Sequence, residues 1–145
     1  ISKKKNNQAK NIKWFCNRAE KLPFPSDFFN YYTVSFGIRN MDNIDFALKE
    51  AYRVLKPGGR FICLEFSKIE NEIIEKFYNH YSNLIPKIGK IIVGKDTPYE
   101  YLVQSIKNFY NQEELAKKIL SHKFKKISYK NLSFGIAAIH SAWKI

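Results

Sequence analysis

Residues 52–66 read YRVLKPGGRFICLEF, and this stretch decides the fold. Apolar residues before the Pro-Gly-Gly recur at the spacing of one helical face, at Ile44, Leu48, Ala51, Tyr52 and Leu55. Pro57 disfavours helical geometry in the residue before it, so we expect the helix to stop there. Residues 61–66 then form an apolar run interrupted only by Glu65, which is typical of a strand covered by helices on both faces. The pattern predicts an α/β fold.

The composition describes a globular chain with a basic surface. The 145 residues are 45% hydrophobic, which is enough for a packed core, and the formal net charge is +12. Only four of the 25 basic residues are arginine, and an AT-rich genome would give the same bias towards lysine. We therefore favour a solvated lysine-rich surface and expect no nucleic acid, with a basic nucleic-acid-binding module kept as an alternative. Attraction to anionic lipid headgroups stays open.

The cysteines and histidines indicate neither a disulfide nor a metal site. Cys16 and Cys63 lie far apart, fit no C-x-x-C pattern and stand in apolar runs, so we expect two buried, reduced thiols. The three histidines show no ligand spacing. No apolar run reaches the roughly 20 residues that span a bilayer. The expected location is the cytoplasm, with a peripheral contact at the inner membrane left open.

The remaining chain predicts alternating strands and helices. Expected strands cover residues 12–16, 31–36, 125–132 and 136–145, the last two as an antiparallel pair around a Ser-Phe-Gly turn. Expected helices cover residues 44–55 and 70–85 and open again after capping patterns at 97–100 and 111–114, with a loop or lid at 86–96. Asp42 or Asn43 can cap the first helix.

Several motifs in this order resemble one enzyme family. They are AEKLPFP at 19–25, SFGIRN at 35–40, RVLKPGGRFICLEFS at 53–67, YSNLIPKIG at 81–89, YEYLVQSIKNF at 99–109 and NLSFGIAAIHSAWKI at 131–145. The chain is similar, over nearly its whole length, to UbiE-type C-methyltransferases of ubiquinone and menaquinone biosynthesis. These are class I S-adenosylmethionine-dependent methyltransferases. L-x-P-G-G is common to many methyltransferases, whereas SFGIRN and NLSFGIAAIH are far more specific.

The resemblance implies a Rossmann-like sheet of which this chain holds a part. The family's seven strands lie in the order 3-2-1-4-5-7-6, and residues 1–145 match strands 3 to 7, the C-terminal part of a single methyltransferase domain. Nothing in the sequence matches the glycine-rich turn after the family's first strand, or the acidic second strand that binds the cofactor ribose. We therefore expect an unpaired apolar edge at residues 31–36, which invites another chain.

The resemblance also implies which residues would meet S-adenosyl-L-methionine. The family places the adenine beside the pair before E-x-L-P-F and beside the serine that opens SFGIRN, which here are Arg18, Ala19 and Ser35. Arg18 departs from the usual Asn or Asp, and a guanidinium cannot accept a hydrogen bond from the adenine amine. Ser35 could instead be an ordinary residue at a strand end.

The implied reaction is transfer of a methyl group to a ring carbon of a polyprenylated quinol. Arg39 is the candidate catalytic residue, as a cation that stabilises the ring phenolate, and a salt-bridging role for it is the equal alternative. Tyr81 and His80 are the candidate substrate-binding residues, although most such aromatics only pack. Glu65 is expected to end its strand near the cofactor rather than to act as a base.

Three functional interpretations follow. The first is a methyltransferase that works once an N-terminal half is supplied, for example by a complementing N-terminal methyltransferase chain, while this chain alone is inactive. The second is a truncated or decayed fragment without activity. The third is the basic nucleic-acid-binding module, which would need aromatic side chains exposed among the lysines.

Overall fold

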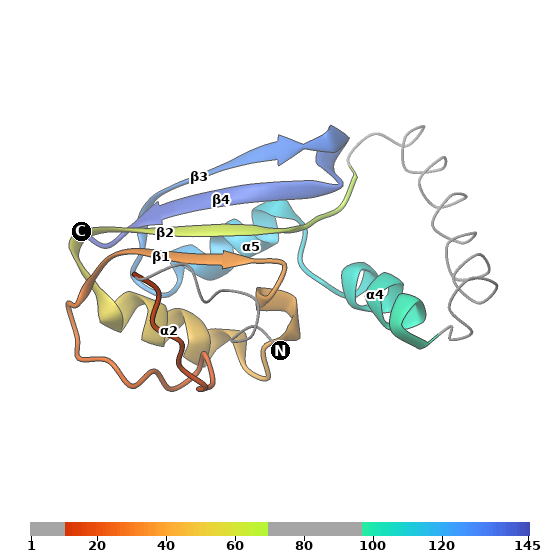
Figure 1. Ribbon diagram of the computed structural model, residues 1–145. Helices are drawn as coiled ribbons and strands as arrows, with labels where there is room; N and C mark the ends of the chain where they lie inside the picture. The colour runs from red at the N-terminus through yellow and green to blue at the C-terminus, as the bar shows by residue number, and fades with distance from the viewer. Residues whose placement is uncertain (1–10, 70–96) are drawn as a thin grey trace.

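The computed structural model describes residues 11–69 and 97–145, which form a mixed sheet with helices (Figure 1). In chain order the elements are β1 (Phe29–Ser35), η1 (Ile38–Asn40), α2 (Ile44–Val54), β2 (Leu55–Phe66), α4 (Thr97–Lys107), α5 (Gln112–Leu120), β3 (Lys125–Leu132), η2 (Ser133–Gly135) and β4 (Ala137–Trp143). The predicted helix at 70–85 and the predicted loop or lid at 86–96 lie outside the described residues.

The strands form a sheet in the order β1-β2-β4-β3. β1 pairs in parallel with β2, while β4 is antiparallel to both β2 and β3. This arrangement confirms the predicted α/β class, the partial Rossmann-like sheet and the antiparallel pair at the end of the chain. Within the described sheet β1 is an edge strand, as predicted.

The junction between α2 and β2 is tighter than the sequence indicates. Asn43 caps α2 by accepting a hydrogen bond from the backbone N–H of Phe46, and the helix ends at Val54. β2 begins at once, at Leu55 rather than at residue 61, and the Pro-Gly-Gly segment forms a bulge in it, since the pairing with β1 passes from Leu55 directly to Arg60. Gly58 takes a φ of 79°, a conformation that glycine adopts at little steric cost.

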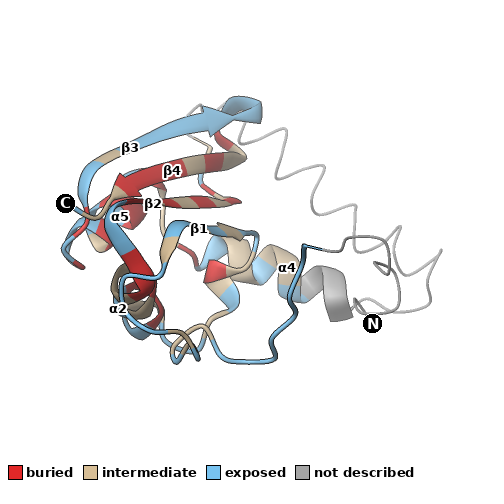
Figure 2. Cartoon of the chain, turned by 60° about the vertical axis from the view of Figure 1, so that its left-hand side comes forward, coloured by how far each residue is buried: buried red, intermediate tan, exposed pale blue. Residues whose placement is uncertain are grey.

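The core lies on one face of the sheet. Phe61 and Cys63 point to this face from β2, and residues of both α2 and α5 pack against them, among them Leu48, Leu115 and Ile119. On the other face of β2, Ile62, Leu64 and Phe66 are only half-buried. Figure 2 shows the same contrast, with buried residues along β2 and β4 and an exposed β3. The sequence predicts helices on both faces of β2. Among the described residues, α2 and α5 cover one of these faces.

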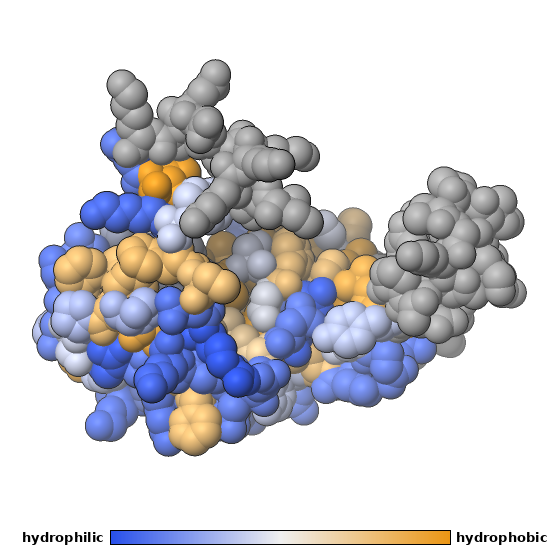
Figure 3. Space-filling view, turned by 60° about the horizontal axis from the view of Figure 1, so that its bottom comes forward, coloured by the Kyte–Doolittle hydropathy of each residue, from blue (hydrophilic) through white to orange (hydrophobic). Residues whose placement is uncertain are grey.

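The predicted strand at residues 12–16 is wrong: this segment has no regular secondary structure, and Cys16 is exposed instead of buried. The described sheet offers it no neighbouring strand, so it lies on the surface. Edge-to-face contacts between Phe15 and Phe24 and between Phe24 and Phe29 hold it beside β1. On the face formed by this segment and α2, apolar side chains gather in a band among hydrophilic ones (Figure 3).

The second capping pattern is confirmed. Asn111 and Glu114 form a complete capping box at the start of α5, with each side chain accepting a hydrogen bond from the other residue's backbone N–H. α4 begins at Thr97, as the first pattern predicts. In residues 11–69 and 97–145, no helix combines the length and apolar character needed to cross a bilayer.

Candidate functional site

The candidate site lies where the parallel strands β1 and β2 end. In open α/β sheets, ligands bind beyond the carboxyl ends of the strands. Ser35 is the last residue of β1 and is exposed, Arg39 follows in η1, and Glu65 stands one residue before the end of β2. The sequence therefore brings Ser35 and Arg39 to the same end of the sheet through one short connection.

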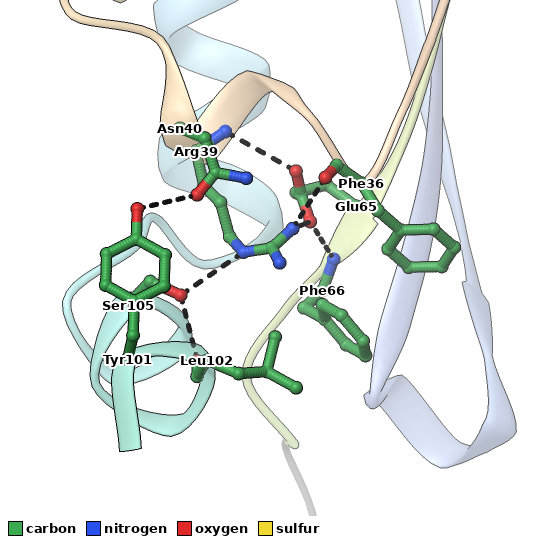
Figure 4. A network of polar contacts seen from close by, with 8 residues as sticks. All are labelled: Phe36, Arg39, Asn40, Glu65, Phe66, Tyr101, Leu102 and Ser105. Carbon is green, nitrogen blue, oxygen red and sulfur yellow. Dashed lines mark hydrogen bonds and ion pairs between the residues drawn. The ribbon is translucent and has the colours of Figure 1, made fainter. Parts of the chain in front are cut away.

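Arg39 and Glu65 form a buried ion pair (Figure 4). Arg39 Nη1 lies 2.6 Å from Glu65 Oε1, and the two side chains are only 8% and 1% exposed. The same Glu65 oxygen accepts a hydrogen bond from the backbone N–H of Phe66 at 2.9 Å, and Glu65 Oε2 accepts one from the backbone N–H of Arg39 at 3.4 Å. These bonds compensate the carboxylate for its loss of water.

The ion pair also connects the sheet to α4. Arg39 Nε donates to Ser105 Oγ at 3.3 Å, and Ser105 Oγ donates to the carbonyl of Leu102. One helical turn earlier, the Tyr101 hydroxyl donates to Asn40 Oδ1 at 2.9 Å. α4 is thus fixed to η1 by two side-chain hydrogen bonds, both visible in Figure 4.

One nitrogen of the Arg39 guanidinium has no acceptor among the described residues. Nη1 donates to the Phe36 carbonyl and to Glu65, and Nε donates to Ser105, whereas Nη2 donates to no residue in the described part of the chain. The guanidinium also lies 5.2 Å from the centroid of the Phe66 ring. The salt-bridging role considered for Arg39 is therefore present.

Arg18 and Ala19 precede β1 in the chain and lie beside the connection between η1 and α2, which holds Asp42 and Asn43. The Arg18 guanidinium pairs with Asp42, and it is 69% exposed. Glu20 accepts a hydrogen bond from the backbone N–H of Asn43 at 3.1 Å, and this bond is the main reason that the pKa of Glu20 is lowered. These contacts hold the segment that contains Ala19 at the same end of the molecule as Ser35.

These positions fit the adenosyl end of S-adenosylmethionine in part. Ser35 is exposed and its hydroxyl can both donate and accept, and Ala19 is half-buried. Arg18 does not fit an adenine amine, because its guanidinium is donor-only and pairs with Asp42. Among the predicted contacts in the described residues, the chemistry of Ser35 and Ala19 is compatible with the adenosyl end and that of Arg18 is not.

The other predicted site features are less informative. His80 and Tyr81 lie outside the described residues. Burial raises the pKa of the Cys63 thiol to about 12, so this cysteine is inert at neutral pH. No group of three or more His, Cys, Asp or Glu side chains in residues 11–69 and 97–145 could hold a metal ion.

Sequence reasoning missed the partners of Arg39. Glu65 was the only charged residue in an apolar strand, and such a residue needs a counter-ion when buried; this signal could have paired it with Arg39. Nothing in the sequence identifies Ser105 or Tyr101, because their contacts depend on how α4 docks.

Solved structures with the same fold define the class of the domain. A SAM-dependent methyltransferase from Thermotoga maritima, described as a possible histamine N-methyltransferase, is 22% identical, with a TM-score of 0.59 over 88% of this chain and 61% of that one. A SAM-dependent methyltransferase from Aquifex aeolicus is 14% identical, with a TM-score of 0.61 over 94% and 56%. The [4+2]-cyclase SpnF reaches 0.62 at 18% identity, over 90% and 56%. The chain has part of the class I methyltransferase fold.

The family follows from the sequence comparison. The ubiE/COQ5 methyltransferase family matches residues 1–144, and the chain belongs to this family. It is 56% identical over 140 residues to the "Ubiquinone/menaquinone biosynthesis C-methyltransferase UbiE" of Rickettsia bellii (strain OSU 85-389), and 54% identical to the protein of that name from Rickettsia prowazekii (strain Madrid E). Each match covers 96% of this chain and 56% of the relative, so the chain spans little more than half the length of these relatives.

Proposed function

We propose that this chain provides the part of a methyltransferase active site that contains Arg39. The proposed enzyme methylates a ring carbon of a polyprenylated benzoquinol or naphthoquinol in ubiquinone or menaquinone biosynthesis. The observation that carries the proposal is the identity of more than half of the aligned residues to relatives named for this activity. SpnF has the same fold and is named as a cyclase, so the fold alone would not support this function.

We also propose that an N-terminal half supplies the glycine-rich turn that residues 1–145 lack. β1 is an edge strand of the described sheet, so a parallel strand can pair with its free backbone groups. Large apolar side chains are exposed beside this edge, among them Trp14, Phe15, Phe28 and Tyr31. An exposed apolar patch of this kind marks a surface that another part of a protein covers. We propose that the complementing N-terminal half docks here.

Arg39 is the proposed catalytic residue. A ring carbon becomes nucleophilic when the adjacent hydroxyl loses its proton, and a preorganised cation stabilises the resulting phenolate. The bonds to Glu65, Phe36 and Ser105 fix the orientation of the guanidinium. Nη2 can therefore donate to the phenolate oxygen without a further loss of side-chain entropy. Tyr81 and His80 stay candidates for contact with the quinol ring.

S-adenosyl-L-methionine would supply a methyl group already activated by its positive sulfur. Ser35 and Ala19 of this chain would hold its adenosyl end, at the carboxyl end of β1. Because Arg18 offers no acceptor and the sequence lacks the glycine-rich turn, we expect the chain alone to bind the cofactor weakly or not at all. A micromolar dissociation constant in a calorimetric titration of the purified chain would contradict this expectation.

Reconstitution tests the proposal. The chain is co-purified with a polypeptide that carries the two N-terminal strands and the glycine-rich turn, and the complex is incubated with a prenylated quinol and a donor carrying a deuterated methyl group. Mass spectrometry should then detect one labelled methyl on the quinol ring. A folded complex that binds the donor but never methylates the quinol would favour the inactive-fragment interpretation.

Variants of Arg39 separate its role from that of the surface charge. Arg39→Met should lower kcat by about 100-fold, because one preorganised donor to an oxyanion contributes at least this factor. Lys117→Gln, on the exposed face of α5, is the control and should leave turnover unchanged. Equal activity of Arg39→Met and the unchanged complex would exclude Arg39 from catalysis.

A further inference from the structure

A second cavity lies at the end of the sheet opposite the candidate site. It has a volume of about 470 Å³, and its lining includes Asp27, shortly before β1, and Lys144, directly after β4. The ends of α2 and α5 provide further lining residues, Arg53 and Lys123. In Figure 1 this end carries the C-terminus and the start of β2, whereas the carboxyl ends of β1 and β2 and helix α4 are at the other end.

The lining of this cavity is strongly basic. Its charged residues are four cations, Lys49, Arg53, Lys123 and Lys144, and one acid, Asp27. Two further acids, Glu50 and Asp45, lie just outside, with Lys118 beside Asp45. Counting these three as well leaves an excess of two positive charges among the described side chains around the cavity.

Internal ion pairs fix part of the lining in place. Lys144 Nζ lies 2.7 Å from Asp27 Oδ1 and donates to the Tyr52 carbonyl at 2.9 Å, and its side chain is mostly buried. The Arg53 guanidinium bonds to Glu50 and to the carbonyls of residues 22 and 24. These two cations are anchored, so they shape the cavity before any ligand enters.

Two other cations form no ion pair within the described residues, although Lys49 lies close enough to Asp45 to contribute to its lowered pKa. Lys49 and Lys123 are exposed, and neither forms an ion pair with any residue that the structure describes. Lys49 Nζ lies 5.4 Å from the centroid of the Phe46 ring, and Lys123 takes a φ of 70° just after α5. A lysine that caps a helix C-terminus donates hydrogen bonds to the last backbone carbonyls. Within the described residues, neither of these ammonium groups forms such a hydrogen bond.

The helix dipoles do not cancel this charge. α2 and α5 both end near the cavity, and each helix C-terminus contributes a partial charge of roughly −0.5. Together they offset about one of the two excess positive charges. The cavity therefore attracts an anion, and a compact anion with several oxygens uses the unpaired ammonium groups best.

We infer that this cavity binds a phosphate-bearing anion. Lysine ammonium groups bind phosphate as point charges, and hydroxyl groups in the lining, from Ser26 and Tyr52, can donate to its oxygens. The phosphate can belong to a soluble molecule or to a lipid headgroup, because the two present the same charged group. The site is remote from Arg39 and does not depend on the proposed methyl transfer.

The test uses the whole chain with two matched double variants. Lys49→Gln/Lys123→Gln removes the unpaired cations, and Lys117→Gln/Lys130→Gln removes the same charge from exposed positions outside the cavity. Inorganic pyrophosphate is titrated by calorimetry at low salt, and circular dichroism confirms that each variant is folded. The cavity variant should bind about tenfold more weakly, because each exposed charge contributes up to roughly 1 kcal/mol. The control should change by less than about twofold.

A second arm identifies the source of the phosphate. Vesicles of phosphatidylcholine alone and with added phosphatidylglycerol are sedimented with each variant. Binding of pyrophosphate but not of vesicles supports a soluble ligand, and binding of the anionic vesicles that the cavity variant loses supports a headgroup. Equal weakening in both variants would overturn the inference, because the probe would then bind to the overall positive charge rather than to the cavity. No binding of either probe by the unchanged chain would overturn it as well.

Discussion

Replacing Glu65 by glutamine should destabilise the chain far more than its small chemical change suggests. The substitution keeps the side-chain volume but removes the charge that neutralises Arg39, whose side chain is only 8% exposed. It also turns one acceptor into an NH₂ group, which then faces either the backbone N–H of Arg39 or the donors at Oε1. Both effects leave buried polar groups without partners.

The expected cost is about 3 kcal/mol. Removal of one partner from a buried ion pair typically costs 3–5 kcal/mol, because the other charge stays buried and uncompensated. We take the lower end, since the Arg39 guanidinium keeps its bonds to Phe36 and Ser105 and the amide oxygen can still accept one hydrogen bond. For a domain with a urea m-value of about 2 kcal/mol/M, this cost lowers the unfolding midpoint by about 1.5 M.

Urea unfolding followed by circular dichroism measures this cost, and a double-mutant cycle isolates the pair. Arg39→Met, Glu65→Gln and the double variant should give a coupling energy of about 2 kcal/mol, because the second substitution removes the charge that the first leaves unpaired. Glu113→Gln is the matched control: its pair with Lys117 is exposed on both sides, so its cost should stay below about 0.5 kcal/mol.

A small effect would refute the reasoning. If Glu65→Gln cost less than about 1 kcal/mol, the carboxylate would contribute no more than an ordinary surface pair. A coupling energy near zero would show that Arg39 and Glu65 do not act as a pair in solution.

Three further predictions concern single residues elsewhere in the fold. Gly59→Ala should cost about 2 kcal/mol in urea unfolding, because the added Cβ would lie 2.7 Å from the carbonyl oxygen of Lys56. Asn111→Ala should cost about 1 kcal/mol through loss of the α5 capping box, and Asn111→Ser should restore most of it. Burial lowers the pKa of His140, so the unfolded chain binds the proton more readily; stability should be full above the unfolded pKa of about 6.5 and fall as the pH drops below it. Unfolding midpoints between pH 5 and 8 should show this slope, and His140→Gln should flatten it.

The elements of this fold were largely predictable because local signals and tertiary packing agree in them. Asn43 and Asn111 cap helices as their spacing predicts, and the strand after Pro57 carries the apolar run of a buried strand. The boundary of β2 was not predictable. Proline and two glycines usually signal a turn, whereas here they form a bulge between the Leu55 and Arg60 pairings with β1, and Gly58 and Gly59 bond to the backbone of Lys144.

The features that the sequence did not predict depend on contacts with residues far away in the sequence. The segment at residues 12–16 has strand composition, but a strand forms only where a neighbour satisfies its backbone groups, and the described sheet offers none. For the candidate site, the motif identified Arg39 and Ser35, while the contacts of Arg39 with Glu65 and Ser105 span 26 and 66 residues of sequence. Separations of this length leave no periodic signal in a single sequence.

These contacts have a consequence for how the proposed enzyme is assembled. Every group that fixes the Arg39 guanidinium, namely Glu65, the Phe36 carbonyl and Ser105, belongs to this chain. The proposed catalytic cation can therefore be oriented before a complementing half pairs with β1. The adenosyl end is different, because in the proposed enzyme Ser35 and Ala19 would cover only one side of it and the proposed N-terminal half would supply the glycine-rich turn. We therefore expect the docking of that half to govern the affinity for the methyl donor, while the position of Arg39 stays the same in the separate and the assembled chain.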